Sequence, residues 1–160
     1  MYGGTFTVYR EGVLVGEAHN LMTSDGIDLI ENVLTGTGNY HTGRVMGGMR
    51  IGSIGGTSQR SGGFTQSTNA QERQAIVRNA NTVTADGAMT ISFQADFPAV
   101  ASPVVTEIKN IAIVYGGGST VTSGEITFAA VSEDDPGITW LPVNRTPNTA
   151  FTITYTLIIG

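Results

Sequence analysis

Alternation of apolar and polar residues dominates this chain and predicts strands along most of its length. In the stretch 5–10, Phe6 and Val8 share one side, while threonine and tyrosine occupy the other. The final stretch, 150–159, repeats the pattern, with an apolar residue at every second position and threonine between them. A period of two places successive side chains on opposite faces of a sheet. We therefore expect strands with one apolar, inward face and one threonine-bearing, outward face.

Turn residues separate these strands from their neighbours. Glu11-Gly12 joins 5–10 to a second strand at 13–18, which predicts a hairpin. Asp86-Gly87 precedes an alternating strand at 89–97. The remaining stretches that we interpret as strands or extended pieces are 49–54, 72–79, 104–115, 125–132 and 140–143.

One segment, 20–36, has the three-to-four-residue apolar spacing of an amphipathic helix. Ile27, Ile30 and Leu34 recur on one face, and Gly36 follows as a C-terminal stop. We expect Ile30 to be buried. A short side-chain oxygen can cap the first turn by accepting from its unpaired amides, and the candidates are Thr23, Ser24 and Asp25.

About eight strands and one early helix predict an all-β fold. We expect an antiparallel β-sandwich or jelly-roll-like barrel, with the short helix near the N-terminus covering an open end or edge. With 160 residues, a single domain spanning 1–160 is the natural organisation. The alternation of 104–115 breaks at 108–110, where we expect a bulge or a corner at which the chain changes sheets.

Composition narrows the class of function. The net charge of -5 and the absence of any run of basic residues argue against nucleic acid as a partner. Charged residues make up 13% of the chain, about half the usual share. A surface of threonine, serine and asparagine loses little hydration energy on docking, so this composition suits a subunit covered by neighbours. No apolar run approaches ~18 residues and no signal-peptide pattern precedes the first strand, so we expect neither membrane insertion nor export.

The residues that carry chemistry do not form a recognisable active site, and we expect no enzyme. The chain has no cysteine, two histidines (His19 and His41) and no serine in a G-x-S-x-G setting. The acidic run 133–135 lacks the spacing of a calcium loop and is interpreted as a solvated turn, with calcium as the alternative. Glycines at 47–48 and 52–56 lack the Gly-Lys-Ser/Thr of a phosphate cradle. We expect no catalytic residue, cofactor or metal.

Two aromatic residues stand out as candidate contacts with a partner. Phe64 is the one large apolar residue in the glycine- and serine-rich tract 55–71. A tract of this length in a compact domain is usually functional or disordered. We interpret it as a loop that becomes ordered against a neighbour, with free disorder as the alternative. Trp140 follows the acidic turn and is interpreted as a core or interface anchor, with a carbohydrate platform as the alternative.

Short elements along almost the whole chain form a pattern when they are taken together. After the opening hairpin they are Asn20-Leu21-Met22-Thr23 with Gly26 starting a helix, Arg50-Ile51-Gly52-Ser53-Ile54-Gly55, Gln71-Glu72-Arg73, Glu107-Ile108, Leu141-Pro142-Val143 and Thr152-Ile153-Thr154-Tyr155-Thr156-Leu157. Together they resemble small β-sandwich virion proteins of tailed bacteriophages, of the capsid decoration (cement) type or of the tail-tip and fibre type.

The resemblance implies an assembly role without an active site. The leading hypothesis is a capsid decoration protein that bridges and stabilises capsid subunits, with the major capsid protein or other virion proteins as partners. It implies a homo-oligomer, for which we expect a trimer, assembled in the host cytoplasm and located on the capsid surface or tail. The alternative is a tail-fibre, tail-tip or glycan-binding module, which should carry several exposed aromatic residues and a polar pocket. A cement protein should instead spread threonine, glycine and short apolar segments over broad flat patches.

The tract around Phe64 generates the first testable prediction. An exposed phenylalanine among small residues serves well as an anchor that is buried only at an interface. Phe64→Ala should therefore weaken attachment to the partner particle and leave the melting temperature of the isolated subunit nearly unchanged. Both quantities can be measured on the same variant. A loss of several kcal/mol in the isolated subunit would instead place Phe64 in the core, and unchanged occupancy would move the interface elsewhere.

Overall fold

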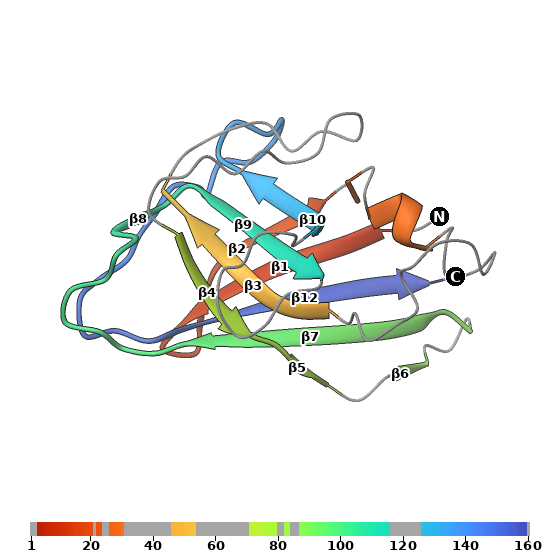
Figure 1. Cartoon of the computed structure of the whole chain (residues 1–160), viewed down its shortest axis with the longest axis horizontal. Helices are drawn as coiled ribbons and strands as arrows, with labels where there is room; N and C mark the ends of the chain where they lie inside the picture. The colour runs from red at the N-terminus through yellow and green to blue at the C-terminus, as the bar shows by residue number, and fades with distance from the viewer. Residues whose placement is uncertain are drawn as a thin grey trace.

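The computed structural model of the chain describes residues 3–20, 22–23, 26–30, 46–53, 71–79, 82–83, 87–115 and 126–159. These residues form an antiparallel β-sandwich with one short helix at 26–30, as the sequence predicts (Figure 1). Two principal sheets and a small accessory sheet account for the strands of the described residues.

The larger sheet has six strands, in the order β2-β1-β12-β7-β5 with β6 paired to β7. Its strands are β1 (Gly3–Arg10), β2 (Val13–Asn20), β5 (Val77–Arg78), β6 (Thr82–Val83), β7 (Met89–Phe97) and β12 (Phe151–Ile159). The opposing sheet has the order β10-β9-β3-β4. Its strands are β3 (Met46–Gly52), β4 (Gln71–Ala75), β9 (Asn110–Tyr115) and β10 (Ile126–Ser132). A two-stranded sheet pairs β8 (Glu107–Ile108) with β11 (Val143–Asn144).

The core lies between the two principal sheets. Tyr155 on β12 contacts Phe6 on β1, with ring centroids 4.8 Å apart, and meets Phe128 of the opposing sheet edge-on at 6.3 Å. Phe97 and Phe151 stack at 4.6 Å where β7 ends and β12 begins. Aromatic pairs of this kind stabilise by about 0.5–1.5 kcal/mol beyond the area that they bury. The predicted inward residues of β12 from Phe151 to Leu157 are buried, which confirms the alternation.

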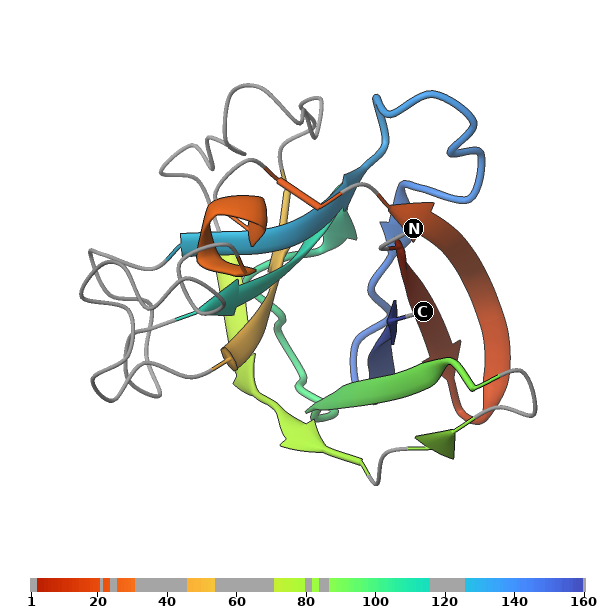
Figure 2. The ribbon, with the colours of Figure 1, turned by 90° about the vertical axis from the view of Figure 1, so that its right-hand side faces the viewer.

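Strands that change sheets connect the two layers. The break in alternation at 108–110 is a corner of this kind, because β8 belongs to the accessory sheet and β9 to the four-stranded sheet. The predicted strand 72–79 likewise divides, with β4 in one principal sheet and β5 in the other. Figure 2 shows this crossing at the lower corner of the sandwich. On the opposite side, an isolated bridge between Met22 and Ala129 continues from β2 to β10.

The hairpin that opens the chain forms as predicted. Glu11 and Gly12 both have positive φ, 50° and 78°, which is the geometry of a two-residue turn between twisted strands. Arg10 and Val13 are therefore paired directly across the turn. This places the side chain of Arg10 at the end of the sandwich that also holds the β8–β11 sheet.

The helix is capped as predicted but buries a different face. Thr23 is the cap, because its Oγ1 accepts from the amide of Gly26 at 3.0 Å. Leu29 is buried at 7% exposure and Ile30 packs half-buried against the core, whereas Ile27 is 41% exposed. The prediction that Ile27 faces inward is therefore wrong, and Ile30 is less buried than expected. Leu34 and Gly36 lie outside the described residues.

The orientation of this helix can be tested with two truncations on one turn. Leu29→Ala should lower the free energy of unfolding by about 2–5 kcal/mol, because it leaves a cavity against the core. Ile27→Ala, the matched control, should change it by no more than about 0.5 kcal/mol. Chemical denaturation of both variants measures the difference. Equal losses would contradict the observed helix orientation.

Candidate functional site

The outward face of the six-stranded sheet is a regular array of short polar side chains. We call it the threonine face, and it comprises Thr5, Thr7, Tyr9, Leu14, Glu17, His19, Val77, Thr90, Ser92, Gln94, Asp96, Thr152, Thr154, Thr156 and Ile158. Most of these residues alternate along their strand with buried residues, which places them on the outward face. The others are paired across the sheet with residues of that outward face. Regular pairing along β1, β12 and β7 aligns them in rows that run across the sheet.

Three rows define the centre of the threonine face. The first runs through Thr5, Thr156 and Ser92, the second through Thr7, Thr154 and Gln94, and the third through Tyr9, Thr152 and Asp96. Each row therefore crosses β1, β12 and β7 in direct register. Side chains directly opposite on neighbouring strands lie about 4.5–5.5 Å apart at Cβ, close enough to interact.

Hydrogen bonds between neighbouring strands hold this array in place. Ser92 Oγ and Thr156 Oγ1 are 3.1 Å apart, and Thr152 Oγ1 donates to Asp96 Oδ1 at 2.8 Å. At the β2 edge, Thr5 Oγ1 and His19 Nδ1 are 2.9 Å apart. Because β-branched threonine has restricted side-chain torsions, such a surface loses little conformational entropy when another surface covers it.

Apolar side chains and carboxylates interrupt the hydroxyl array at a few positions. Leu14 is 53% exposed, Val77 64% and Ile158 42%. Glu17 on β2 and Asp96 on β7 are also exposed, and the residues of the threonine face include no lysine or arginine. The face is thus mostly neutral and weakly acidic.

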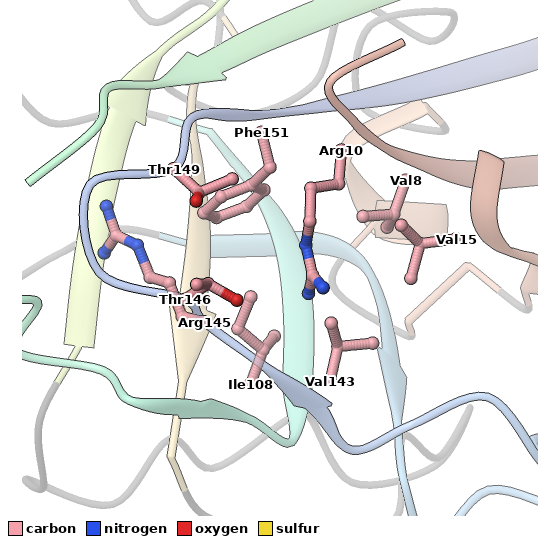
Figure 3. A pocket seen from close by; sticks show the side chains of 9 residues that line it. All are labelled: Val8, Arg10, Val15, Ile108, Val143, Arg145, Thr146, Thr149 and Phe151. Atoms are coloured by element: carbon pink, nitrogen blue, oxygen red, sulfur yellow. The ribbon is translucent and has the colours of Figure 1, made fainter. Parts of the chain in front are cut away.

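A pocket lies at the β8–β11 end of the sandwich, opposite the helix (Figures 1 and 3). Its empty volume is about 260 Å³, part of which is open solvent. The walls are mostly apolar and come from five strands and the 145–149 loop. The lining residues are Val8, Arg10, Val15, Ile108, Val143, Arg145, Thr146, Thr149 and Phe151. Figure 3 shows the guanidinium of Arg10 extending among these apolar side chains, whereas the guanidinium of Arg145 lies to one side, near the ring of Phe151.

A buried ion pair fixes the loops that frame this pocket. Arg145 is 5% exposed and pairs with Glu72 Oε2, while its Nη2 donates to the carbonyl of Pro98 at 3.2 Å. The other oxygen of Glu72 accepts from the amides of Val104 and Val105 at 2.9 and 3.2 Å. The guanidinium carbon of Arg145 also lies 5.2 Å from the ring centroid of Phe151. The sequence did not identify Glu72 and Arg145 as an ion pair, because the two residues are 73 positions apart.

Of the two aromatic residues singled out from the sequence, one lies among the described residues and the other does not. Phe64 lies outside the described residues. Trp140 is half-buried and packs against the core, and its ring lies over Gly16 of β2. A Cβ at position 16 would come within 2.3 Å of ring carbons of Trp140. The ring of Trp140 thus fixes the 133–142 segment against β2, and glycine at 16 leaves the space that it needs.

The other residues considered for chemistry are engaged in local contacts. Asp135 Oδ2 accepts from the amide of Ser132 at 2.7 Å, and Glu133 lies 3.2 Å from Lys109 Nζ. The hydrogen bond and negative charge of Glu133 raise the pKa of Lys109 above its ordinary value. No group of three or more potential metal-ligating side chains occurs in the described ranges. His19 belongs to the threonine face, whereas His41 lies outside the described residues.

Comparisons with models of protein families, with curated proteins and with solved structures found no match for this chain. Among the described residues, no helix is long and apolar enough to span a bilayer.

The role of Trp140 can be tested with a double-mutant cycle. Gly16→Ala should destabilise the isolated subunit by about 1–3 kcal/mol, because the added methyl group meets the indole ring. In a Trp140→Leu background the same change should cost less, because the smaller side chain leaves room. Denaturation of the four proteins gives a coupling energy, which should be about 0.5–3 kcal/mol. Strictly additive losses would show that Trp140 does not pack on β2.

Proposed function

We propose that the chain is a non-enzymatic structural subunit of a tailed-bacteriophage virion, most simply a capsid decoration protein that bridges and stabilises capsid subunits. Its location would be the virion surface, and its partners the major capsid protein or other virion proteins. The observation that carries the proposal is the threonine face, a broad surface of short polar side chains on the six-stranded sheet.

The chemistry of the threonine face suits permanent contact with another protein. Hydroxyl groups that already hydrogen-bond to one another, such as the Ser92–Thr156 pair, require little rearrangement when water is displaced. Exposed apolar groups such as Leu14 and Ile158 supply the favourable burial. Contacts of modest strength become effective when symmetry repeats them over a particle or an oligomer such as the expected trimer.

A glycan-binding tip would present different features. Such sites usually combine exposed aromatic platforms with convergent polar groups. In the part of the chain that the structure describes, Tyr9 is the one exposed tyrosine, phenylalanine or tryptophan, with 37% exposure. The pocket at the β8–β11 end has mainly apolar walls. These observations favour a decoration protein over a receptor-binding tip. The experiment below distinguishes a location on the tail from one on the head.

The proposal is tested by placing one large charge at the centre of the threonine face. Thr154→Arg introduces a long cation in the middle row, directly between Thr7 and Gln94. The variant should fold normally, because its side chain points outward. Its occupancy on purified particles that lack the chain should fall at least tenfold. The matched control is Thr106→Arg, at an exposed loop position outside the threonine face.

Quantitative mass spectrometry of sedimented particles, combined with electron microscopy of labelled protein, measures occupancy and location. Wild type and Thr106→Arg should bind equally, at the head for a decoration protein. Binding at the tail would assign the alternative role. Failure of the wild-type chain to join any particle would refute the virion function, whereas normal occupancy of Thr154→Arg would exclude the threonine face as the docking surface.

A further inference from the structure

We propose that a lysine side chain of another virion protein pairs with Asp96 when the threonine face docks, and that an apolar part of the same protein covers Tyr9 and Leu14. The inference rests on the proposed function, because it names the chemistry of the surface that the threonine face meets. It is carried by the third row of that face, which runs from Asp96 through Thr152 and Tyr9 and continues to Leu14 on β2.

Asp96 is an exposed carboxylate that its neighbours hold in one position. Its Oδ1 accepts from Thr152 Oγ1 at 2.8 Å and from Gln94 Nε2 at 3.0 Å, and the same Nε2 donates to Oδ2 at 3.2 Å. Both donor groups are neutral. Among the described residues, no lysine or arginine lies within ion-pair distance of Asp96. The negative charge of Asp96 is therefore uncompensated in the described part of the subunit.

Covering this carboxylate is costly unless a cation comes with the covering surface. An exposed aspartate is stabilised by water, whereas a charge that another surface removes from water loses this hydration. Asp96 is paired directly with Thr152 of the central strand β12, so a protein that covers the centre of the threonine face also covers Asp96. The covering surface must therefore bring a positive charge to this position.

The hydrogen bonds already present favour lysine over arginine as the source of this charge. A carboxylate has about four acceptor positions, and the contacts with Thr152 and Gln94 occupy three of them. A bidentate pair with the planar fork of arginine requires an open position on each oxygen. The compact ammonium group of lysine requires only one, and the open position of Asp96 is on Oδ2.

The other end of the row has apolar chemistry. Tyr9 and Leu14 are exposed and are paired directly with each other across β1 and β2. Two strand spacings, about 10 Å, separate Tyr9 from Asp96. The matching surface therefore carries a lysine and an apolar side chain at roughly this separation. Burial of the apolar groups contributes affinity, and the ion pair fixes the orientation of docking.

A second copy of the chain does not match this row. The threonine face carries the carboxylates of Asp96 and Glu17 and no lysine or arginine. Two such faces would bring negative charges together, and like charges across an interface are unfavourable. The net charge of -5 also favours encounter with a basic surface. The occupant of the threonine face is thus a different protein.

The ion pair is tested by affinity measurements on purified particles that lack the chain. Asp96→Asn keeps the shape of the side chain and removes its charge, so it should lower the affinity for the particle by about tenfold or more. The matched control Asp134→Asn removes a charge from the exposed acidic turn outside the threonine face and should bind like wild type. Melting temperatures establish that each variant is folded.

The apolar end is tested in the same assay. Leu14→Ala should weaken binding about fivefold, because it removes apolar area that docking buries. The control Val104→Ala, at an exposed loop position outside the threonine face, should leave the affinity unchanged.

A zero-length carbodiimide cross-link identifies the partner group directly. The reagent joins a carboxylate to an amine that already lies in contact with it. Wild type bound to the particle should therefore yield a peptide in which Asp96 is linked through an amide bond to a lysine of another virion protein. Mass spectrometry of the digested particles detects this peptide, which should be missing when Asp96→Asn is used.

The outcomes separate this inference from the proposed function. If wild type joins no particle, the virion function is refuted and this inference with it. If wild type binds but Asp96→Asn binds equally well, or if Asp96 forms no cross-link to a lysine, the function stands and the inference is overturned. A cross-link from Asp96 to a lysine of a second copy of the chain would also overturn it.

Discussion

The central position of β12 is the constraint on which the rest of the structure depends. This strand pairs with β1 on one side and with β7 on the other over nearly its whole length. Its inward residues provide the middle of the core, where Tyr155 connects Phe6 in its own sheet to Phe128 in the opposing sheet. A strand paired on both edges and buried on one face leaves a single free surface, which is the outward one.

That outward surface has a composition that solubility alone does not require. Outward positions of soluble sheets are usually occupied by charged residues as well as by threonine, and charges also discourage unwanted association. Here the central rows carry mainly threonine, serine and glutamine, with the carboxylate of Asp96 in the third row and that of Glu17 on the edge strand β2. Docking of a neutral hydroxyl surface requires no unpaired charge to be buried. The array of hydroxyl side chains that pairs across neighbouring strands therefore also suits contact with another protein.

Local patterns predicted the parts of the fold that depend on local physics. The period-two alternation identified β7 and β12, and Glu11-Gly12 identified the first hairpin, because a two-residue turn with positive φ is encoded in adjacent residues. The break at 108–110 likewise indicated the corner between sheets. The helix face was assigned wrongly because three-to-four spacing fits either Ile27 or Leu29 when the surface beneath is unknown. The capping contacts of Thr23 with β10 decide the orientation.

The sequence predicted part of the threonine face but none of the pocket. Threonine at outward positions was visible as a pattern, but the rows of the threonine face depend on the pairing of strands that are distant in sequence, such as β1 with β12. The pocket depends on Arg10, Phe151 and the β8–β11 pair meeting at one end of the sandwich. Its supporting ion pair joins Glu72 to Arg145, and neither residue has a local signal that would separate it from an ordinary surface charge.

Hydroxyl-radical footprinting of the chain, free and bound to the virion particle proposed as its partner, tests the central claim most directly. The exposed side chains of Tyr9 and Leu14 report on the threonine face, and Val104, exposed in the loop at the β8–β11 end, reports on a surface outside it. Attachment should sharply lower the oxidation of Tyr9 and Leu14 and leave that of Val104 unchanged. Undiminished oxidation of Tyr9 and Leu14 in the attached protein would contradict it.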